Sequence, residues 1–89
     1  MSPPPESRFC LEVLADTDPG VLIRLVERIQ SLALTPMRLS AQWFLGERVW
    51  ITFVFIGADE ISIETLTRRI AHFPTVHFAV WKREPSPSI

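Results

Sequence analysis

Three side chains in the sequence, Cys10, His72 and His77, have the chemistry of metal ligands or nucleophiles. Their spacing does not match the short intervals between ligands that are typical of zinc sites. Cys10 lies in an apolar run with no adjacent base to activate its thiol. His72 falls near the end of an expected helix, where a positive charge is mildly stabilised. We interpret all three side chains as structural and expect no metal and no cofactor.

Carboxylates and glycines form no catalytic pattern either. Asp59, Glu60 and Glu64 gather where a helix is expected to begin, and carboxylates there cap the backbone and complement the helix dipole. The chain has 3 glycines, and they are too far apart to form a phosphate-binding loop. These observations predict a protein that is not an enzyme, because no polar cleft with an acid, a base or a nucleophile can be assembled.

The candidate binding site is the segment Asp-Thr-Asp-Pro-Gly-Val-Leu at residues 16–22. Thr17 or Asp18 can cap a helix, and Pro19 suits its first turn. Gly20 lacks a Cβ, so a ligand or a packed neighbour can come close to its backbone. A helix start also exposes N–H donors and a partial positive charge, which together attract a carboxylate. An ordinary strand-to-helix turn is the alternative that these residues leave open.

Length, composition and charge limit the classes of protein to which the chain can belong. With 89 residues and a hydrophobic content of 47%, the chain can form one small domain with a core. A net charge of -1 gives no electrostatic footprint for nucleic acid. The apolar runs are shorter than the ~20 residues of a membrane span, and the Pro-rich start does not resemble a signal peptide. We therefore expect a cytoplasmic protein that binds neither nucleic acid nor a membrane.

Hydrophobic periodicity predicts six elements between two proline-rich ends. Residues 1–7 are expected to be a disordered leader, residues 8–83 the folded domain, and residues 84–89 a disordered tail. Alternating apolar residues indicate strands, and apolar residues three or four positions apart indicate helices. Ser62 is expected to cap the second helix. The predicted elements are a strand over 8–14, a helix over 19–33, strands over 37–45 and 47–56, a helix over 63–73 and a strand over 75–82.

The order β-α-β-β-α-β predicts an α+β fold of the ferredoxin-like class. Two right-handed crossovers produce a sandwich in which a four-stranded antiparallel sheet has both helices on one face. The other face should then carry an apolar surface that is large for a monomer, and the sheet also has unpaired edges. We therefore expect a homodimer or a higher oligomer. The residues assigned to this face are Cys10, Leu14, Phe44, Trp50, Val54, Ile56, Ala79 and Trp81, with Val76, Phe78 and Val80 facing the core.

An RNA-recognition module has the same topology and must be weighed. Such a module needs aromatic side chains on the exposed face of its central strands, surrounded by basic residues. Trp50 and Trp81 would correspond to these aromatic side chains. However, the strands carry no Gly-aromatic motif with flanking Lys or Arg, and the net charge is negative. This interpretation is therefore disfavoured.

With this element order and the residues DTDPGVL in the first loop, the chain resembles the ACT domain, a small amino-acid-sensing module. The resemblance covers nearly all of residues 8–83, and its most specific part is the Pro-Gly-Val-Leu sequence that opens the first helix. A chain of this size is most similar to the short regulatory subunit of acetolactate synthase. That resemblance implies a dimer that docks on a large, thiamine-diphosphate-dependent catalytic subunit. It also implies a branched-chain amino acid as effector.

The resemblance also implies which residues contact the effector. Carried over by position, these are Thr17, Asp18, Gly20 and Val21 in the loop, and Thr35 after the first helix. Thr17 stands where the family usually has Asp or Asn, and Thr35 where it usually has Asn. A hydroxyl has fewer hydrogen-bonding groups than an amide, so these positions bear on whether an effector binds. A regulatory domain that senses an amino acid is therefore one hypothesis, and an assembly module without a small-molecule site is the other.

Overall fold

The computed structural model describes residues 8–44 and 46–84 and contains the six predicted elements in the predicted order. The expected leader lies outside the described residues, as does the expected tail except for Glu84. That residue belongs to the last strand, so the fold extends one residue further than the sequence suggests. The elements are β1 (Arg8–Asp16), α1 (Pro19–Ser31), β2 (Arg38–Phe44), β3 (Arg48–Ile56), α2 (Glu60–Ala71) and β4 (Val76–Glu84).

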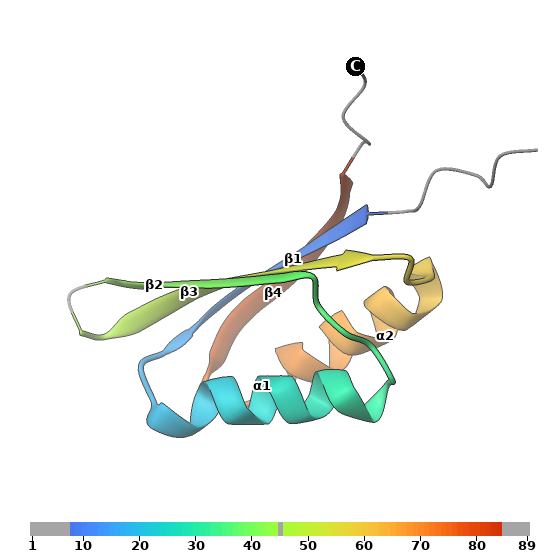
Figure 1. Cartoon of the computed structure of the whole chain (residues 1–89). Coiled ribbons are helices and arrows are strands. Elements are labelled where there is room, and N and C mark those ends of the chain that lie inside the picture. Colours follow the sequence, from blue (N-terminus) through green and yellow to red (C-terminus); the bar gives the residue numbers. More distant parts are fainter. Residues whose placement is uncertain (1–7, 45, 85–89) are drawn as a thin grey trace, which may run out of the picture.

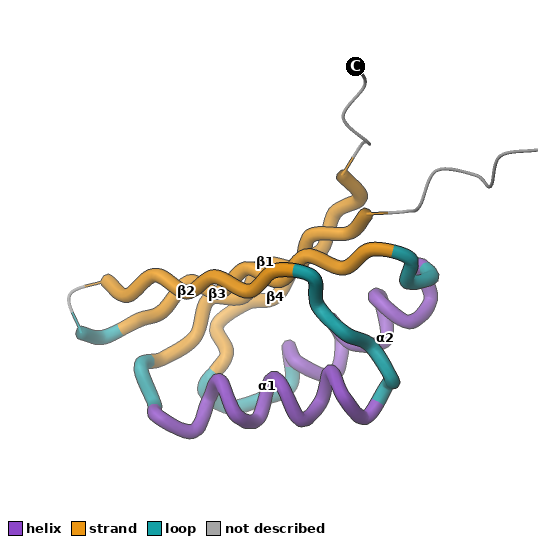
Figure 2. Tube along the Cα trace, in the orientation of Figure 1, coloured by secondary structure: helices purple, strands orange, loops and turns teal. Residues whose placement is uncertain are grey.

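The strands form one antiparallel sheet in the order β2-β3-β1-β4, with β2 and β4 at its edges. Figures 1 and 2 show that α1 and α2 lie together on one side of the sheet. This arrangement confirms the predicted ferredoxin-like α+β fold. Each helix connects two strands that are not neighbours in the sheet, so α1 crosses over β3 and α2 crosses over β1.

An aspartate caps the start of each helix. The side chain of Asp18 accepts a hydrogen bond from the backbone N–H of Gly20, and Pro19 occupies the first turn of α1. In α2 the cap is Asp59, not Ser62 as the sequence suggested. Ser62 instead donates its backbone N–H and its hydroxyl to the Asp59 carboxylate, at 2.8 and 3.0 Å. Aspartate prevails because an ionised carboxylate offers more acceptor sites than a hydroxyl.

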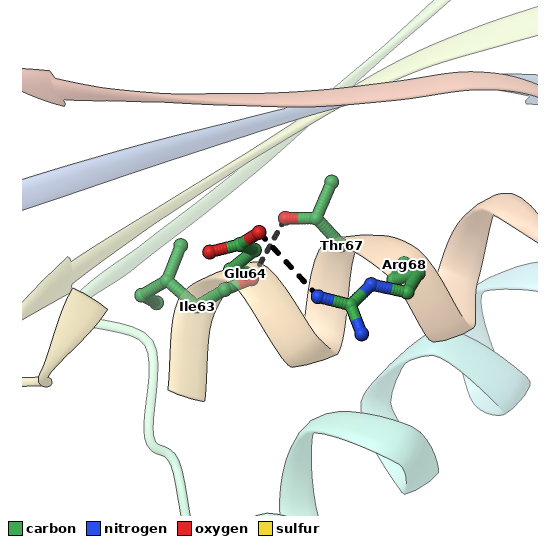
Figure 3. A network of polar contacts seen from close by, with 4 residues as sticks. All are labelled: Ile63, Glu64, Thr67 and Arg68. Carbon is green, nitrogen blue, oxygen red and sulfur yellow. Dashed lines mark hydrogen bonds and ion pairs between the residues drawn. The ribbon is translucent and has the colours of Figure 1, made fainter. Parts of the chain in front are cut away.

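The middle of α2 is held by local polar contacts (Figure 3). The Thr67 hydroxyl donates to the Ile63 carbonyl oxygen at 2.8 Å. Arg68 pairs with Glu64 at 3.4 Å, one helical turn earlier. Glutamate four residues before arginine is the favourable orientation on a helix, and such a pair contributes about 0.3–0.5 kcal/mol. The ion pair lies on the exposed side of α2, while the hydrogen bond of Thr67 is partly buried beside the face that packs on the sheet.

The core lies between the helices and the inward face of the sheet. Alternate residues of β1 and β3 point inward, as the sequence predicts, and one stripe of each helix meets them. Phe53 and Phe55 stack with their ring centroids 6.3 Å apart. The buried core cluster comprises Phe9, Leu11, Val13, Ala15, Val21, Leu25, Ile29, Val49, Ile51, Phe53, Phe55, Ile63, Leu66 and Ile70.

The face of the sheet away from both helices is called the open face below. In β1, β2 and β3 its apolar members are those that the sequence predicts, although Cys10 is only 4% exposed there. In β4 the prediction was wrong. The open face carries Leu14, Phe44, Trp50, Val54, Ile56, Phe78 and Val80, together with the almost buried Cys10.

An irregularity in β4 explains this reversal. Leu14 pairs with Phe78 and the next residue, Ala15, pairs with Val76, so β4 has one extra residue at His77. A bulge of this kind changes the phase of a strand. Val76 therefore faces the core as predicted, while Phe78 and Val80 turn to the open face. Ala79 and Trp81 turn inward, and the Trp81 ring meets the edge of Phe9 with centroids 5.7 Å apart.

We predict that the α2 cap makes stability depend on acidic pH. Hydrogen bonds from the Ser62 backbone and side chain hold the pKa of Asp59 below its ordinary value of 3.8. A carboxyl whose pKa is lower in the folded state stabilises the fold above its unfolded pKa, and this contribution disappears as the pH falls through the folded value. Asp59→Ala is therefore expected to lower the Tm by a few degrees at neutral pH and to have little effect near pH ~2.

Asp59→Asn is the matched control, because asparagine also caps helices but does not titrate. Its Tm is expected to stay near that of the parent at neutral pH. Thermal unfolding followed by circular dichroism across the acidic range measures both variants. An equal loss from Asp59→Ala at all pH values would contradict the role of the charged carboxylate.

Candidate functional site

A cavity of about 230 Å³ lies between the start of α1 and the strands β2 and β3. The β1–α1 loop supplies Thr17 and Asp18, which the sequence predicts as ligand contacts. Val21, also predicted, faces the cavity from the first turn of α1. The full lining comprises Thr17, Asp18, Pro19, Val21, Leu22, Trp43 and Val49. The lining is mostly apolar, with the Asp18 carboxylate as its charged group.

Two backbone hydrogen bonds fix the loop that forms one side of this cavity. The N–H of Asp16 donates to the Thr75 carbonyl oxygen at 2.8 Å, just before β4. The N–H of Thr17 donates to the Glu47 carbonyl oxygen at 3.0 Å, in the β2–β3 hairpin. The hairpin turns at Gly46, whose φ of 81° lies in the region that favours glycine. The loop is thereby joined to segments on both sides of β1.

The start of α1 differs from the expected carboxylate site, because its first N–H groups are already used. Pro19 has no N–H, the Gly20 N–H bonds the Asp18 side chain at 3.2 Å, and the Val21 N–H bonds the Asp18 carbonyl oxygen at 2.9 Å. The other side-chain oxygen of Asp18 lies 3.7 Å from Arg24. The cavity therefore presents a carboxylate rather than free backbone donors. Such a group favours a cationic part of a ligand.

Two of the predicted contacts do not line the cavity. Gly20 belongs to the first turn of α1 but does not reach the cavity wall. Thr35 follows the other end of α1, a helix of 13 residues and therefore about 20 Å long. It lines a separate hollow of about 210 Å³ beside Phe55 and Gly57. Within one chain, the structure thus brings Thr17, Asp18 and Val21 together and leaves Thr35 apart.

We predict that Gly20→Ala stabilises the domain. A Cβ built at Gly20 would have its nearest neighbours, in Arg24 and Asp18, at 3.8 Å, which is ordinary contact. Alanine is favoured over glycine in helices by up to about 1 kcal/mol, so a gain of roughly 0.5–1 kcal/mol is expected in urea unfolding. Gly57→Ala is the matched control, and it is expected to destabilise because Gly57 has φ +82°. A destabilised Gly20→Ala protein would contradict this account.

The sequence interpretation missed Trp43 and Val49, which form the wall of the cavity opposite the loop. They are directly paired across β2 and β3, so they share one face of the sheet. Trp43 faces the helix side but is 54% exposed, because β2 lies at the edge of the sheet. The alternation of apolar residues in β2 places Trp43 on the inward face. Only the order of the strands shows that this position is next to the loop.

The cysteine and the two histidines have separate surroundings. Burial raises the pKa of the Cys10 thiol, and the carboxylates of Glu12 and Glu84 raise it further against the opposing charge of Lys82. His77 lies 2.6 Å from the Asp16 carboxylate, and His72 lies 2.7 Å from the Arg68 carbonyl oxygen. Within residues 8–44 and 46–84 there is no cluster of side chains that could hold a metal ion. Over the same residues, no helix is long and apolar enough to cross a membrane.

Comparison with protein-family models found no match, and comparison with curated proteins found none either. Solved structures do match. The ACT domain of a GTP pyrophosphokinase from Chlorobium tepidum superposes with a TM-score of 0.73 and 8% identity, over 86% of this chain and 99% of that domain. The C-terminal domain of the MgtC protein from Mycobacterium tuberculosis gives a TM-score of 0.73 and 15% identity, over 94% of both chains.

A homoserine dehydrogenase from Thiobacillus denitrificans contains a similar unit within a longer chain. It matches with a TM-score of 0.71 and 14% identity, over 88% of this chain and 17% of that enzyme. At these identities, structural similarity establishes the fold. The chain therefore has the ferredoxin-like fold found in ACT domains.

Proposed function

We propose that this chain is a non-catalytic regulatory domain of the ACT type. In this proposal it self-associates, binds an amino acid beside the β1–α1 loop and modulates a partner enzyme. The observation that carries the proposal is the cavity between that loop and β2, where Thr17 and Asp18 lie opposite Trp43. The ACT-like fold supports the class of function, and the cavity supports the ligand.

The lining of the cavity supports an amino acid with an apolar side chain. Val21, Leu22 and Val49 offer aliphatic surface, and Trp43 offers an aromatic wall. The cavity is smaller than the roughly 300–1,000 Å³ that is usual for drug-sized ligands, which suits a molecule as small as an amino acid. In this proposal the Asp18 carboxylate pairs with the ligand's ammonium group. A branched-chain amino acid combines both features.

A second copy of the chain at the β2 edge would complete this site. β2 is an edge strand, and the exposed side chains of Leu39 and Trp43 on β2 and of Ile23 on α1 lie on the same side of the sheet. Antiparallel pairing of β2 with β2 of the second copy would cover the strand edge. It would also bring Thr35 of the second copy toward the end of β2 that carries Trp43. This arrangement gives Thr35 a role across the interface that it lacks within one chain.

The partner that we propose is the large, thiamine-diphosphate-dependent catalytic subunit of acetolactate synthase. The support is the resemblance of the DTDPGVL loop and the chain size to the small subunit of that enzyme. Co-purification from the native host tests this assignment. A thiamine-diphosphate-dependent subunit in the purified material would support it, and a different enzyme would replace it.

An assembly module without a small-molecule site is the second candidate. The observation that favours it is the use of the first N–H groups of α1 by Asp18 itself, which leaves no free donor among residues 19–21. Such a domain would keep the β2 edge and its contact with a partner enzyme. It would have no need of the cavity.

Calorimetric titration of the full chain with each of the standard amino acids separates the two functions. Saturable heat with an apolar amino acid, reduced at least tenfold in affinity by Asp18→Asn, is expected for the sensor. Asp16→Asn is the matched control, because Asp16 carries a similar carboxylate that pairs with His77 outside the cavity. The absence of heat with every amino acid would support the assembly module.

A further inference from the structure

We propose that the open face of the sheet binds the open face of a second copy of this chain. The two copies would be related by a two-fold axis that runs parallel to the strands and passes between β1 and β3. This surface is on the opposite side of the sheet from the helices (Figure 1), and the cavity lies on the helix side. The inference therefore does not rest on ligand binding or on the proposed partner enzyme.

Aromatic side chains gather at one end of the open face. Trp50 and Phe78 meet edge to face, with ring centroids 5.4 Å apart, across Leu14 on the intervening strand. Phe44 is 46% exposed at the edge. Beside these rings is a shallow hollow of about 500 Å³ lined by Leu14, Phe44 and Trp50, with Glu47 and Arg48 at its rim. Exposed aromatic groups beside a hollow form the apolar centre that stable interfaces require.

The size of the open face is sufficient for a dimer. Three of its strands have 9 residues and β2 has 7. Strands about 4.8 Å apart with a rise of about 3.3 Å per residue give roughly 500 Å² of flat sheet for each copy. Two copies would bury about 1,000 Å² if the sheets are treated as flat, which is the area that a biological interface should at least reach.

The charges of the two central strands are self-complementary about the proposed axis. Within one chain, Asp16 is directly opposite Arg48, and Glu12 is directly opposite Thr52. Rotation about an axis between β1 and β3 exchanges these strands. Arg48 of one copy then faces Asp16 of the second copy, and the Thr52 hydroxyl faces the Glu12 carboxylate. Each of these contacts occurs twice, as a symmetric interface requires.

The same two-fold rotation also brings apolar residues together. Trp50 is directly opposite Leu14 within one chain, and Val54 is directly opposite Cys10. After rotation, Trp50 of one copy lies on Leu14 of the second copy. Phe78 of the second copy comes to the side of the sheet that holds the hollow near Phe44. Sheets that pack face to face keep their strands within about 30° of each other, which this axis permits.

The other two-fold axis in the plane of the interface is less favourable. An axis at right angles to the strands and through the middle row of the sheet would place Glu12 on Glu12 of the second copy. Two carboxylates would then approach in the centre of an apolar surface, where like charges are costly. On the two central strands, the identity of Glu12 and its neighbour Thr52 thus favours the axis parallel to the strands. On the edge strands, the same axis places Lys82 of one copy opposite Arg38 of the second copy, and this contact opposes association.

Substitution at Thr52 tests both the interface and its axis. Under the proposed axis, Thr52→Lys meets Glu12 of the second copy, while Thr52→Glu repels it. We expect wild type and Thr52→Lys to associate similarly in sedimentation equilibrium of the full chain, and the dissociation constant of Thr52→Glu to rise at least about tenfold. Failure of both Thr52 variants to associate would indicate the perpendicular axis and would overturn the proposal.

Further variants cover the remaining outcomes. Gln30→Lys and Gln30→Glu carry the same changes of charge on the exposed side of α1, away from the open face, and are expected to leave association unchanged. Phe78→Ser is expected to weaken association by at least about tenfold, with circular dichroism reporting an intact fold. A mass that none of the open-face variants changes would overturn the proposal, whether the wild type is a monomer or associates elsewhere. Titration with amino acids is independent of these results.

Discussion

Phe53→Ala is expected to cost about 3–5 kcal/mol of the free energy of unfolding, the range for removal of a buried phenylalanine. Phe53 is 0% exposed and stacks on Phe55. It lies on β3 between Leu11 of β1 and Leu39 of β2, so its ring fills the centre of the layer beneath the helices. Small domains have only about 5–15 kcal/mol of total stability. The variant is therefore expected to be largely unfolded at modest urea concentration.

Phe44→Ala is the matched control for this prediction. It makes the same chemical change on β2, but Phe44 is on the open face and 46% exposed. Its cost to the folding of a single copy, apart from any effect on association, is expected to be about 1 kcal/mol or less. Urea unfolding followed by circular dichroism compares the two variants at one protein concentration. Similar midpoints for both variants would mean that the core is not centred on Phe53.

Trp43→Ala is expected to weaken the affinity for an apolar amino acid by about 30–100-fold while the domain stays folded. Trp43 forms the wall of the cavity opposite Thr17 and Asp18, and a ligand between them would cover its ring. More than half of this side chain is exposed in the single chain, so its removal costs the fold little. Calorimetric titration gives the affinity, and thermal unfolding gives the stability.

Trp50→Ala provides the matched control for Trp43→Ala. Trp50 directly follows Val49, the residue that pairs with Trp43, and it lies on the open face and outside the lining of the cavity. Its substitution is expected to leave the affinity unchanged within about twofold. Equal losses from both variants would show that the effect is general and not due to the cavity. That result would remove the main support for an amino acid site.

The sequence was sufficient to predict the fold because each element carries its own local signal. Apolar residues repeat with a period of two in β1 and β3, and the stripe of α1 begins at a proline and an aspartate cap. The inward and outward faces of β4 could not be predicted. The extra residue at His77 breaks the alternation, and it is visible only in the pairing of β4 with β1. Because of this one residue, Phe78 lies on the open face, where the sequence predicted Trp81.

Only the part of the candidate site that comes from one continuous segment could be predicted. Thr17, Asp18 and Val21 belong to one continuous segment whose capping residues are evident in the sequence. Trp43 joins them through the order of the strands, because α1 crosses β3 to reach β2. The sequence also offers both Thr17 and Asp18 as caps, and only the structure shows that Asp18 takes the first N–H group. That contact depends on the side-chain conformation of Asp18.

The two hydrogen bonds of the β1–α1 loop, from Asp16 to Thr75 and from Thr17 to Glu47, make this loop a junction between three stretches of chain that are distant in sequence. Any displacement of the loop must be followed by the entry to β4 or by the β2–β3 hairpin, or else break a bond. In the proposed regulatory role, an amino acid bound near Asp18 would therefore act on both margins of the sheet at once. A shift of a few atoms at this loop would then change the fit between the proposed neighbouring subunits.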